Sequence, residues 1–169
     1  MRDLLFPTRR TLLGTAATAG LGLLLAGKAL AADDDFVALE KRSGGRIGVA
    51  ALDKATGTRL THRADERFAM CSTFKFVAAA AVLAAVDKGE LKLDTKVSYG
   101  KADLLSYATV TTKHVAEGGL SLETLCRAAV AVSDNTAANL ILKEIGGPAG
   151  WTAYARSLGD ATSRLDRTE

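Results

Sequence analysis

The chain has 169 residues, with 22 Lys and Arg against 19 Asp and Glu, which gives a formal net charge of +3 at pH 7. This excess lies in the first 31 residues, where one acidic residue, Asp3, stands against four basic ones, Arg2, Arg9, Arg10 and Lys28. The remaining chain is close to neutral and has no basic stretch with interleaved aromatic residues, so a nucleic-acid partner is not expected.

Residues 1–31 have the pattern of a signal peptide. Arg9 and Arg10 precede an apolar run over residues 11–25, and Ala29-Leu30-Ala31 follows as a small-residue cleavage site. We expect cleavage near Ala31 and a periplasmic or secreted protein. A membrane anchor is the alternative, but the run is short and rich in Gly and Ala, so no stable membrane span is expected after signal removal. The paired arginines leave the twin-arginine route open beside the general one.

Metal and disulfide chemistry find little support in the sequence. Cys71 and Cys126 are too few for a disulfide scaffold, even in an exported protein. Together with His62 and His114 they form no cluster with zinc-ligand spacing. We therefore expect neither a metal nor a cofactor.

The elements expected after residue 32 begin with a short helix at residues 36–40. A hairpin of strands 47–52 and 58–62 follows, with residues 54–57 as its turn. Ser72 is a candidate N-cap for a helix to about Lys88, whose apolar composition leaves no clear polar face and predicts burial. Further helices are expected at 121–132, 136–145 and 149–158, bounded by Ser and Gly. The middle of the chain is therefore mostly α-helical.

A hydroxyl and an amine are three residues apart in Ser72-Thr73-Phe74-Lys75. On a helix this spacing puts both on one face, so the amine can assist a serine nucleophile. Spacing alone is weak, because Ser98 and Lys101 repeat it across a glycine that disfavours a helix. The plain alternative for Ser72 is an ordinary helix cap, although the apolar surroundings of Lys75 indicate that its charge has a partner or a purpose.

A second triplet, Ser133-Asp134-Asn135, falls at the junction of two expected helices, where short polar residues commonly cap and turn the chain. The same triplet after an S-x-x-K motif marks penicillin-recognising serine enzymes, whose third motif is K-T-G. Two of these three motifs are present in the expected order.

Longer stretches extend the likeness, namely residues 68–75, 133–140, 145–148 and Ser163-Arg164-Leu165-Asp166-Arg167-Thr168-Glu169. From about Phe36 to its end the chain resembles the class A serine β-lactamases. The resemblance implies an α+β fold of the penicillin-recognising type, here incomplete. Residues 32–68 would be the N-terminal part of an α/β domain, and residues 69–169 an all-α domain that stops at the start of the omega loop. Without K-T-G, we expect this chain to be inactive alone.

The resemblance also implies roles for individual residues in the hydrolysis of a small-molecule β-lactam by a monomer. Ser72 would be the acylated nucleophile, with Lys75, or Glu169 through a water, as its base, and Glu169 would activate the hydrolytic water. Ser133 would protonate the leaving nitrogen. Asn135 and Tyr107 would contact substrate, although plain packing explains Tyr107 equally well. Asp134 and Arg167 would be structural.

Two alternatives remain open at this stage. A penicillin-binding peptidase or lactam sensor would be acylated at Ser72 but would hydrolyse the ester slowly, which the presence of Glu169 disfavours. An exported, non-catalytic helical module would use both triplets only as caps.

Overall fold

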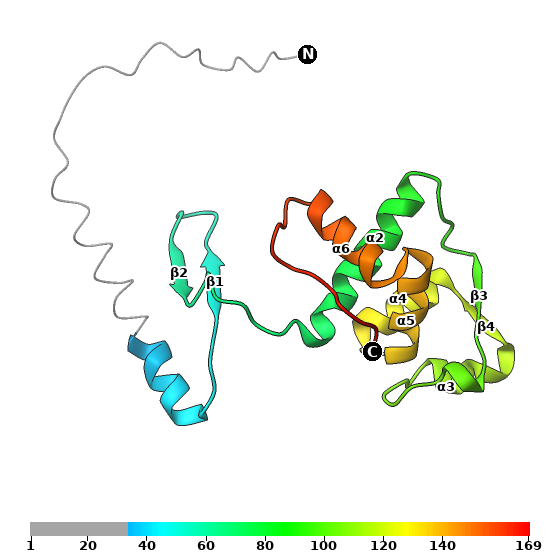
Figure 1. The fold of residues 1–169 in the computed structure, drawn as a ribbon, viewed down its shortest axis with the longest axis horizontal. Helices are drawn as coiled ribbons and strands as arrows, with labels where there is room; N and C mark the ends of the chain where they lie inside the picture. Colours follow the sequence, from blue (N-terminus) through cyan, green and yellow to red (C-terminus); the bar gives the residue numbers. More distant parts are fainter. Residues whose placement is uncertain (1–33) are drawn as a thin grey trace, which may run out of the picture. The chain divides into compact units, whose positions relative to one another are not determined.

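The structure is a computed structural model that describes residues 34–169, so the signal-peptide prediction lies outside the described residues. The chain divides into two compact units, one up to Phe68 and one from Ala69 (Figure 1). Within residues 34–169 no helix is long and apolar enough to span a membrane.

The first unit contains a helix over residues 34–43 and an antiparallel hairpin. Strands β1 (Val49–Leu52) and β2 (Arg59–His62) pair with Leu52 opposite Arg59, as the sequence predicts within two residues at the ends. Gly57 closes the turn at φ 71°, a left-handed conformation that glycine adopts without steric cost. Both strands are largely exposed, so this unit has little apolar core of its own.

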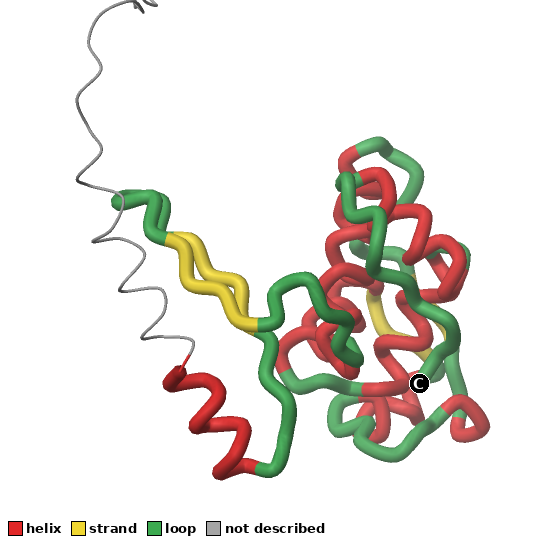
Figure 2. The backbone as a smooth tube through the Cα atoms, turned by 60° about the vertical axis from the view of Figure 1, so that its left-hand side comes forward, coloured by secondary structure: helices red, strands yellow, loops and turns green. Residues whose placement is uncertain are grey.

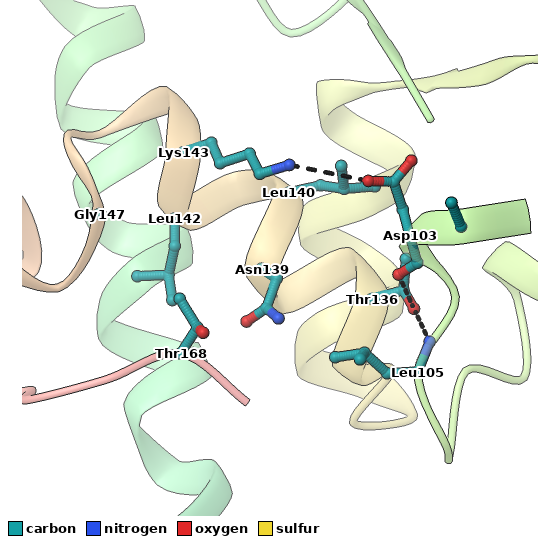
Figure 3. Close-up of a pocket in the computed structure, with 10 residues that line it drawn as sticks. Asp103, Leu105, Thr136, Asn139, Leu140, Leu142, Lys143, Gly147 and Thr168 are labelled. Carbon is teal, nitrogen blue, oxygen red and sulfur yellow. Dashed lines mark hydrogen bonds and ion pairs between the residues drawn. The ribbon is translucent and has the colours of Figure 1, made fainter. Parts of the chain in front are cut away.

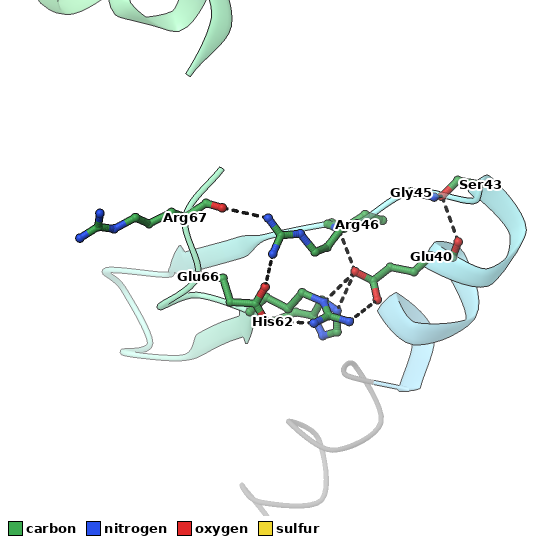
Figure 4. A network of polar contacts seen from close by, with 9 residues as sticks. Glu40, Ser43, Gly45, Arg46, His62, Glu66 and Arg67 are labelled. Carbon is green, nitrogen blue, oxygen red and sulfur yellow. Dashed lines mark hydrogen bonds and ion pairs between the residues drawn. The ribbon is translucent and has the colours of Figure 1, made fainter. Parts of the chain in front are cut away.

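A polar network joins the helix to the hairpin (Figure 4). The Glu40 carboxylate accepts hydrogen bonds from Arg63 Nε at 2.8 Å and from the Ile47 backbone N–H at 2.8 Å. Arg63 also pairs with Glu66, which in turn pairs with Arg46 at 2.6 Å. The hydrogen bond from Arg63 and that from Ile47 lower the pKa of Glu40 to about 2.

The second unit is built around helix α2 (Phe74–Asp87), which packs against α4 (Leu122–Ala131), α5 (Asn135–Glu144) and α6 (Gly147–Ser157). Figure 2 shows these helices gathered in one body. All four helices were expected from the sequence, with ends shifted by one or two residues. Their buried faces form one apolar core that includes Val82, Leu125, Ile141 and Trp151.

Several short elements between residues 96 and 121 were not predicted. Strands β3 (Lys96–Ser98) and β4 (Gly119–Ser121) form an antiparallel pair, and α3 (Thr111–His114) lies between two 3-10 turns, η2 (Lys101–Asp103) and η3 (Val115–Glu117). The second S-x-x-K match is therefore split between the end of β3 and η2, which agrees with the expectation that Ser98 and Lys101 do not share a helix.

The expectation that α2 is buried on every side is wrong for one stripe of the helix. Phe76 is 69% exposed and Leu83 is 48% exposed, seven residues later on the same face. The opposite face, with Ala78 and Val82, is fully buried. An apolar composition thus predicts which residues tolerate burial, but not how many sides of a helix are covered in this chain.

Two caps match the sequence, and one does not. The Ser121 hydroxyl accepts a hydrogen bond from the Thr124 backbone N–H at 3.2 Å and caps α4, and Asp134 caps α5. Ser72 does not cap α2, because it lies inside a 3-10 turn, η1 (Cys71–Thr73), and the N-cap position belongs to Thr73. The alternative interpretation of Ser72 as an ordinary helix cap is therefore wrong.

Candidate active site

Ser72 lies at the surface, on the turn that leads into α2. Cys71 precedes it at φ 45°, a conformation that costs a non-glycine residue on the order of 1–3 kcal/mol. Among the described residues the Ser72 hydroxyl forms no hydrogen bond, either with Lys75 or with another group. A strained turn therefore presents an exposed hydroxyl one helical turn before the Lys75 amine.

Lys75 is the most unusual residue of the second unit, since only 1% of its surface is exposed. Its Nζ donates to the Ser133 backbone carbonyl at 2.9 Å, to Ser133 Oγ at 3.1 Å and to Asn135 Oδ1 at 2.5 Å. The same Nζ lies 3.1 Å from Glu169 Oε1. An amine in an apolar helix is stable only when such partners replace water, so the partner expected from the sequence is present.

The junction between α4 and α5 brings two of these partners to Lys75. Ser133 is held at φ 58°, and the Asp134 backbone N–H bonds back to the Ala128 carbonyl at 3.1 Å. This reversal aims both the carbonyl and the hydroxyl of Ser133 at the amine. Asn135, the first residue of α5, is fixed in turn by its side-chain N–H bond to the Ser106 carbonyl at 3.1 Å.

Asp134 is fully buried and does not face the amine. Its carboxylate accepts hydrogen bonds from the backbone N–H groups of Val110, Thr111 and Ala137, at 2.8 to 2.9 Å, and from the Thr111 hydroxyl. It therefore ties the start of α3 to the start of α5. This geometry agrees with a structural role.

Glu169 reaches the amine although 94 positions separate it from Lys75 in the sequence, and Asn139 anchors it there. Asn139 Oδ1 accepts from the Glu169 backbone N–H at 3.0 Å, and the Asn139 amide donates to the Glu169 carbonyl at 3.5 Å. The end of the chain lies against α5 accordingly (Figure 1). Asn139 was not among the residues expected at the site, because its partner is a backbone group 30 positions away, a contact for which the sequence carries no signal.

Tyr107 and Arg167 lie at the margin of this cluster. Tyr107 is 67% exposed and left-handed at φ 59°, and its backbone carbonyl accepts from the Asn135 N–H at 3.0 Å. Its position relative to Asn135 is thus fixed by the backbone, while its ring faces solvent. Arg167 is exposed and forms no ion pair within residues 34–169, so its structural role stays a prediction.

A pocket of about 270 Å³ includes Asn139 in its lining (Figure 3). Thr136 and Thr168 also line it. Lys143 Nζ lies 3.9 Å from Asp103 Oδ1, and both of these residues belong to the lining as well.

The described residues contain no group of three or more His, Cys, Asp or Glu side chains suited to a metal ion. Cys71 and Cys126 are both free thiols, and burial raises the pKa of Cys126 to about 11.

Comparisons with known proteins match this chain over most of its length. The model of the β-lactamase enzyme family matches residues 31–169. β-Lactamase L2 of Stenotrophomonas maltophilia is 53% identical over 141 residues, which cover 83% of this chain and 46% of that protein. β-Lactamase Toho-2 of Escherichia coli is 48% identical over 160 residues, which cover 92% of this chain and 55% of that protein.

Solved structures of β-lactamases also match this chain. An ancestral class A β-lactamase of Gram-negative bacteria matches with a TM-score of 0.78 at 57% identity. The match covers 82% of this chain and 53% of the chain of that structure. A β-lactamase from Burkholderia vietnamiensis matches with a TM-score of 0.80 at 50% identity over 82% of this chain and 52% of that one.

The chain thus spans about half the length of these relatives, and its mixed helical and sheet architecture is the corresponding part of the class A fold. The family model covers most of the chain, and the relatives and solved structures named above are about half identical to it over the aligned residues. The chain therefore belongs to the β-lactamase enzyme family, in class A.

Proposed function

We propose that the protein containing this chain hydrolyses β-lactams through an acyl-enzyme at Ser72. The observation that carries the proposal is the buried Lys75 amine, surrounded by Ser133, Asn135 and Glu169 within 3.1 Å. The named relatives are β-lactamases, which supports the same reaction class.

The oxygen atoms around Lys75 outnumber its protons. Four acceptors lie near Nζ, whereas an ammonium has three N–H groups to donate. The ion pair with Glu169 therefore competes with the bonds to Ser133 and Asn135. A proton moving from Lys75 to Glu169 leaves a neutral amine beside Ser72, and one remaining on Lys75 leaves Glu169 as a carboxylate base acting through a water. Lys75 and Glu169 are therefore both candidate bases for the acylation of Ser72.

In the acylation step the Ser72 oxygen attacks the lactam carbonyl, and the base takes the hydroxyl proton. As the carbon–nitrogen bond breaks, Ser133 gives its proton to the nitrogen and regains one from Lys75, 3.1 Å away. Asn135 both holds Lys75 and faces the substrate. The Ser72 backbone N–H, in the 3-10 turn that precedes α2, supplies one oxyanion donor.

Acylation by either base leaves the extra proton on Glu169 and a neutral Lys75, so this proton first returns to the amine, whose Nζ lies 3.1 Å from Glu169 Oε1. In the deacylation step the Glu169 carboxylate then takes a proton from a water that attacks the Ser72 ester. The ester bond breaks, Ser72 recovers its proton, and the opened lactam leaves with one carboxylate and one amine. Asn139 is a positioning residue in this step, because its paired hydrogen bonds hold the backbone of Glu169.

The remaining assignments concern location and organisation. Residues 1–31 form an export signal cleaved near Ala31, which agrees with a family match that starts at residue 31. Residues 32–68 belong to an α/β domain, residues 69–169 form a helical domain that carries Ser72, and the mature protein is a periplasmic or secreted monomer.

The test is hydrolysis of nitrocefin by the full-length gene product, followed by labelling with a fluorescent penicillin. We expect turnover that Ser72→Ala abolishes, together with loss of the label. Labelling at Ser72 without turnover would instead identify a peptidase or lactam sensor. Absence of both in a folded protein would leave the non-catalytic helical module.

A further inference from the structure

We infer that Trp151 is a positioning residue for the acylation step, and that its indole N–H restrains the segment between Ser72 and Lys75. This inference rests on the proposed function for its kinetic consequence, but not for its structural one. Trp151 is the only tryptophan of the chain and lies on α6, with 1% of its surface exposed.

The restraint passes through Phe74, the residue immediately before Lys75. Trp151 Nε1 donates to the Phe74 backbone carbonyl at 2.9 Å, across 77 positions of sequence. That carbonyl belongs to the peptide unit that joins Phe74 to Lys75. The Phe74 backbone N–H, on its other side, bonds to the carbonyls of Cys71 and Ser72. Phe74 is therefore tied to the nucleophile through its N–H and to α6 through its carbonyl.

The segment needs an external restraint because its local conformation is unfavourable. Cys71 has φ 45°, and the chain changes from a 3-10 turn to an α-helix between Thr73 and Phe74. Hydrogen bonds in a 3-10 turn are weaker than those in an α-helix. A strained backbone persists only where surrounding contacts over-determine it, and the Trp151 bond is such a contact from another helix.

The start of α6 is itself well fixed, so Trp151 can serve as an anchor. Gly146 precedes the helix at φ 88°, and Pro148 stands in its first turn. Gly150 lies against the Ile145 carbonyl so closely that a Cβ there would collide with it. Its N–H bonds to the Gly146 carbonyl at 3.2 Å. The Gly- and Pro-rich stretch therefore docks α6 onto the end of α5 immediately before Trp151.

The experiment that tests this inference replaces the indole N–H of Trp151. Trp151 is exchanged for β-(3-benzothienyl)alanine, which keeps the shape of indole but has sulfur in place of the N–H. In the full-length gene product we expect the second-order acylation rate at Ser72 to fall about 10-fold, since small displacements of reacting groups have large kinetic effects. Amide exchange at residues 75–78 should become faster, while amides in the core of α5 keep their rates. Tyr154→Phe, which removes a hydroxyl from the same helix, is the control and should change neither quantity.

A merely structural role would lower the amount of folded protein and leave the acylation rate per folded molecule unchanged. Unchanged exchange at residues 75–78 in the isosteric variant overturns the inference, whatever the activity. If the wild-type protein is never acylated, the proposed function fails, and the exchange measurement still decides whether Trp151 restrains this segment. If acylation occurs and the isostere leaves its rate unaltered, Trp151 has no positioning role.

Discussion

The two units of the chain are stabilised by different forces. In the first, up to Phe68, an exposed hairpin and a helix are joined by charged side chains around Glu40 and Arg63. In the second, from Ala69, helices pack around an apolar core, and the charged groups inside it, Lys75 and Asp134, are fully surrounded by hydrogen-bonding partners. Each exposed ion pair contributes little to the free energy of unfolding and is screened by salt. Removal of one partner of a buried charged group lowers the free energy of unfolding much more.

This difference explains why the candidate site lies in the second unit. A reactive amine must be held in one geometry, and a water-excluded helical core supplies that rigidity better than a surface network. The contrast also predicts that substitutions act more strongly in the second unit. Trp151, the only tryptophan, reports unfolding of that unit by fluorescence, and amide exchange in β1 and β2 reports on the first.

The largest effect is expected for Asp134→Ala. It leaves several buried backbone N–H groups without their charged acceptor, which should lower the free energy of unfolding of the second unit by about 3 to 5 kcal/mol. Urea titration followed by Trp151 fluorescence measures this. The matched control is Asp166→Ala, whose exposed side chain pairs with Arg164 alone within residues 34–169. Equal effects for the two variants would contradict the distinction between buried and exposed carboxylates.

Ile141→Ala should come next. Ile141 is fully buried on α5, so the lost contacts and the cavity should cost about 2 to 5 kcal/mol. Leu158→Ala removes a side chain that is 64% exposed and should change stability by less than about 0.5 kcal/mol. The same urea titration compares them, and a large effect at Leu158 would place an unrecognised apolar contact at the end of α6.

Acid should weaken the first unit through Glu40. Its pKa is about 2 in the folded chain, below the ordinary value of 4.5, so the carboxylate stabilises this unit above pH 4.5. That contribution is lost as the pH falls from 4.5 towards 2. We expect amide exchange in β1 and β2 to accelerate over this window, and Glu40→Gln to flatten the dependence. Glu40→Gln should leave the pH dependence of Trp151 fluorescence unaltered. A shift in that dependence would show that Glu40 also affects the stability of the second unit.

The smallest effect is expected at the hairpin turn. Gly57→Ala forces a side chain into a left-handed conformation and should destabilise the hairpin by about 1 to 2 kcal/mol. Gly45→Ala is the control in the same unit, because its φ is not positive and only ordinary contacts surround its Cβ position. Exchange rates in β1 that rise equally in both variants would show that the turn conformation is not the cause.

The sequence predicted α4 and α5 well because these helices carry their own boundary signals, whereas Ser72 is not the cap of α2. Ser121 and Asp134 cap helices, and Gly146 ends one, so local chemistry marks the boundaries. Strands β3 and β4 were missed because each has three residues and its partner lies more than twenty positions away, which leaves no periodicity to detect. The exposed stripe of α2 was missed because composition reports the apolar character of Phe76 and Leu83, not what covers them.

The site was predicted less evenly. Helical spacing indicated that Lys75 can reach Ser72, but only the pair of motifs and the family resemblance distinguished these residues and the Ser133 triplet from ordinary helix caps. The approach of Glu169 to Lys75 depends on long-range packing, so only the family resemblance indicated it. Asn139 and Trp151 were missed because each acts through a backbone group of another segment, and a single sequence carries no signal for such a contact.

We propose that Ser72 is acylated beside the buried Lys75 amine and that Glu169 then activates the water that releases the product. The most direct test is mass spectrometry of the full-length gene product after brief exposure to benzylpenicillin, for the wild type and for Glu169→Gln. We expect an adduct of the intact drug's mass on the peptide that contains Ser72, transient in the wild type and persistent in the variant. An adduct on another peptide, or none in a folded variant, would contradict it.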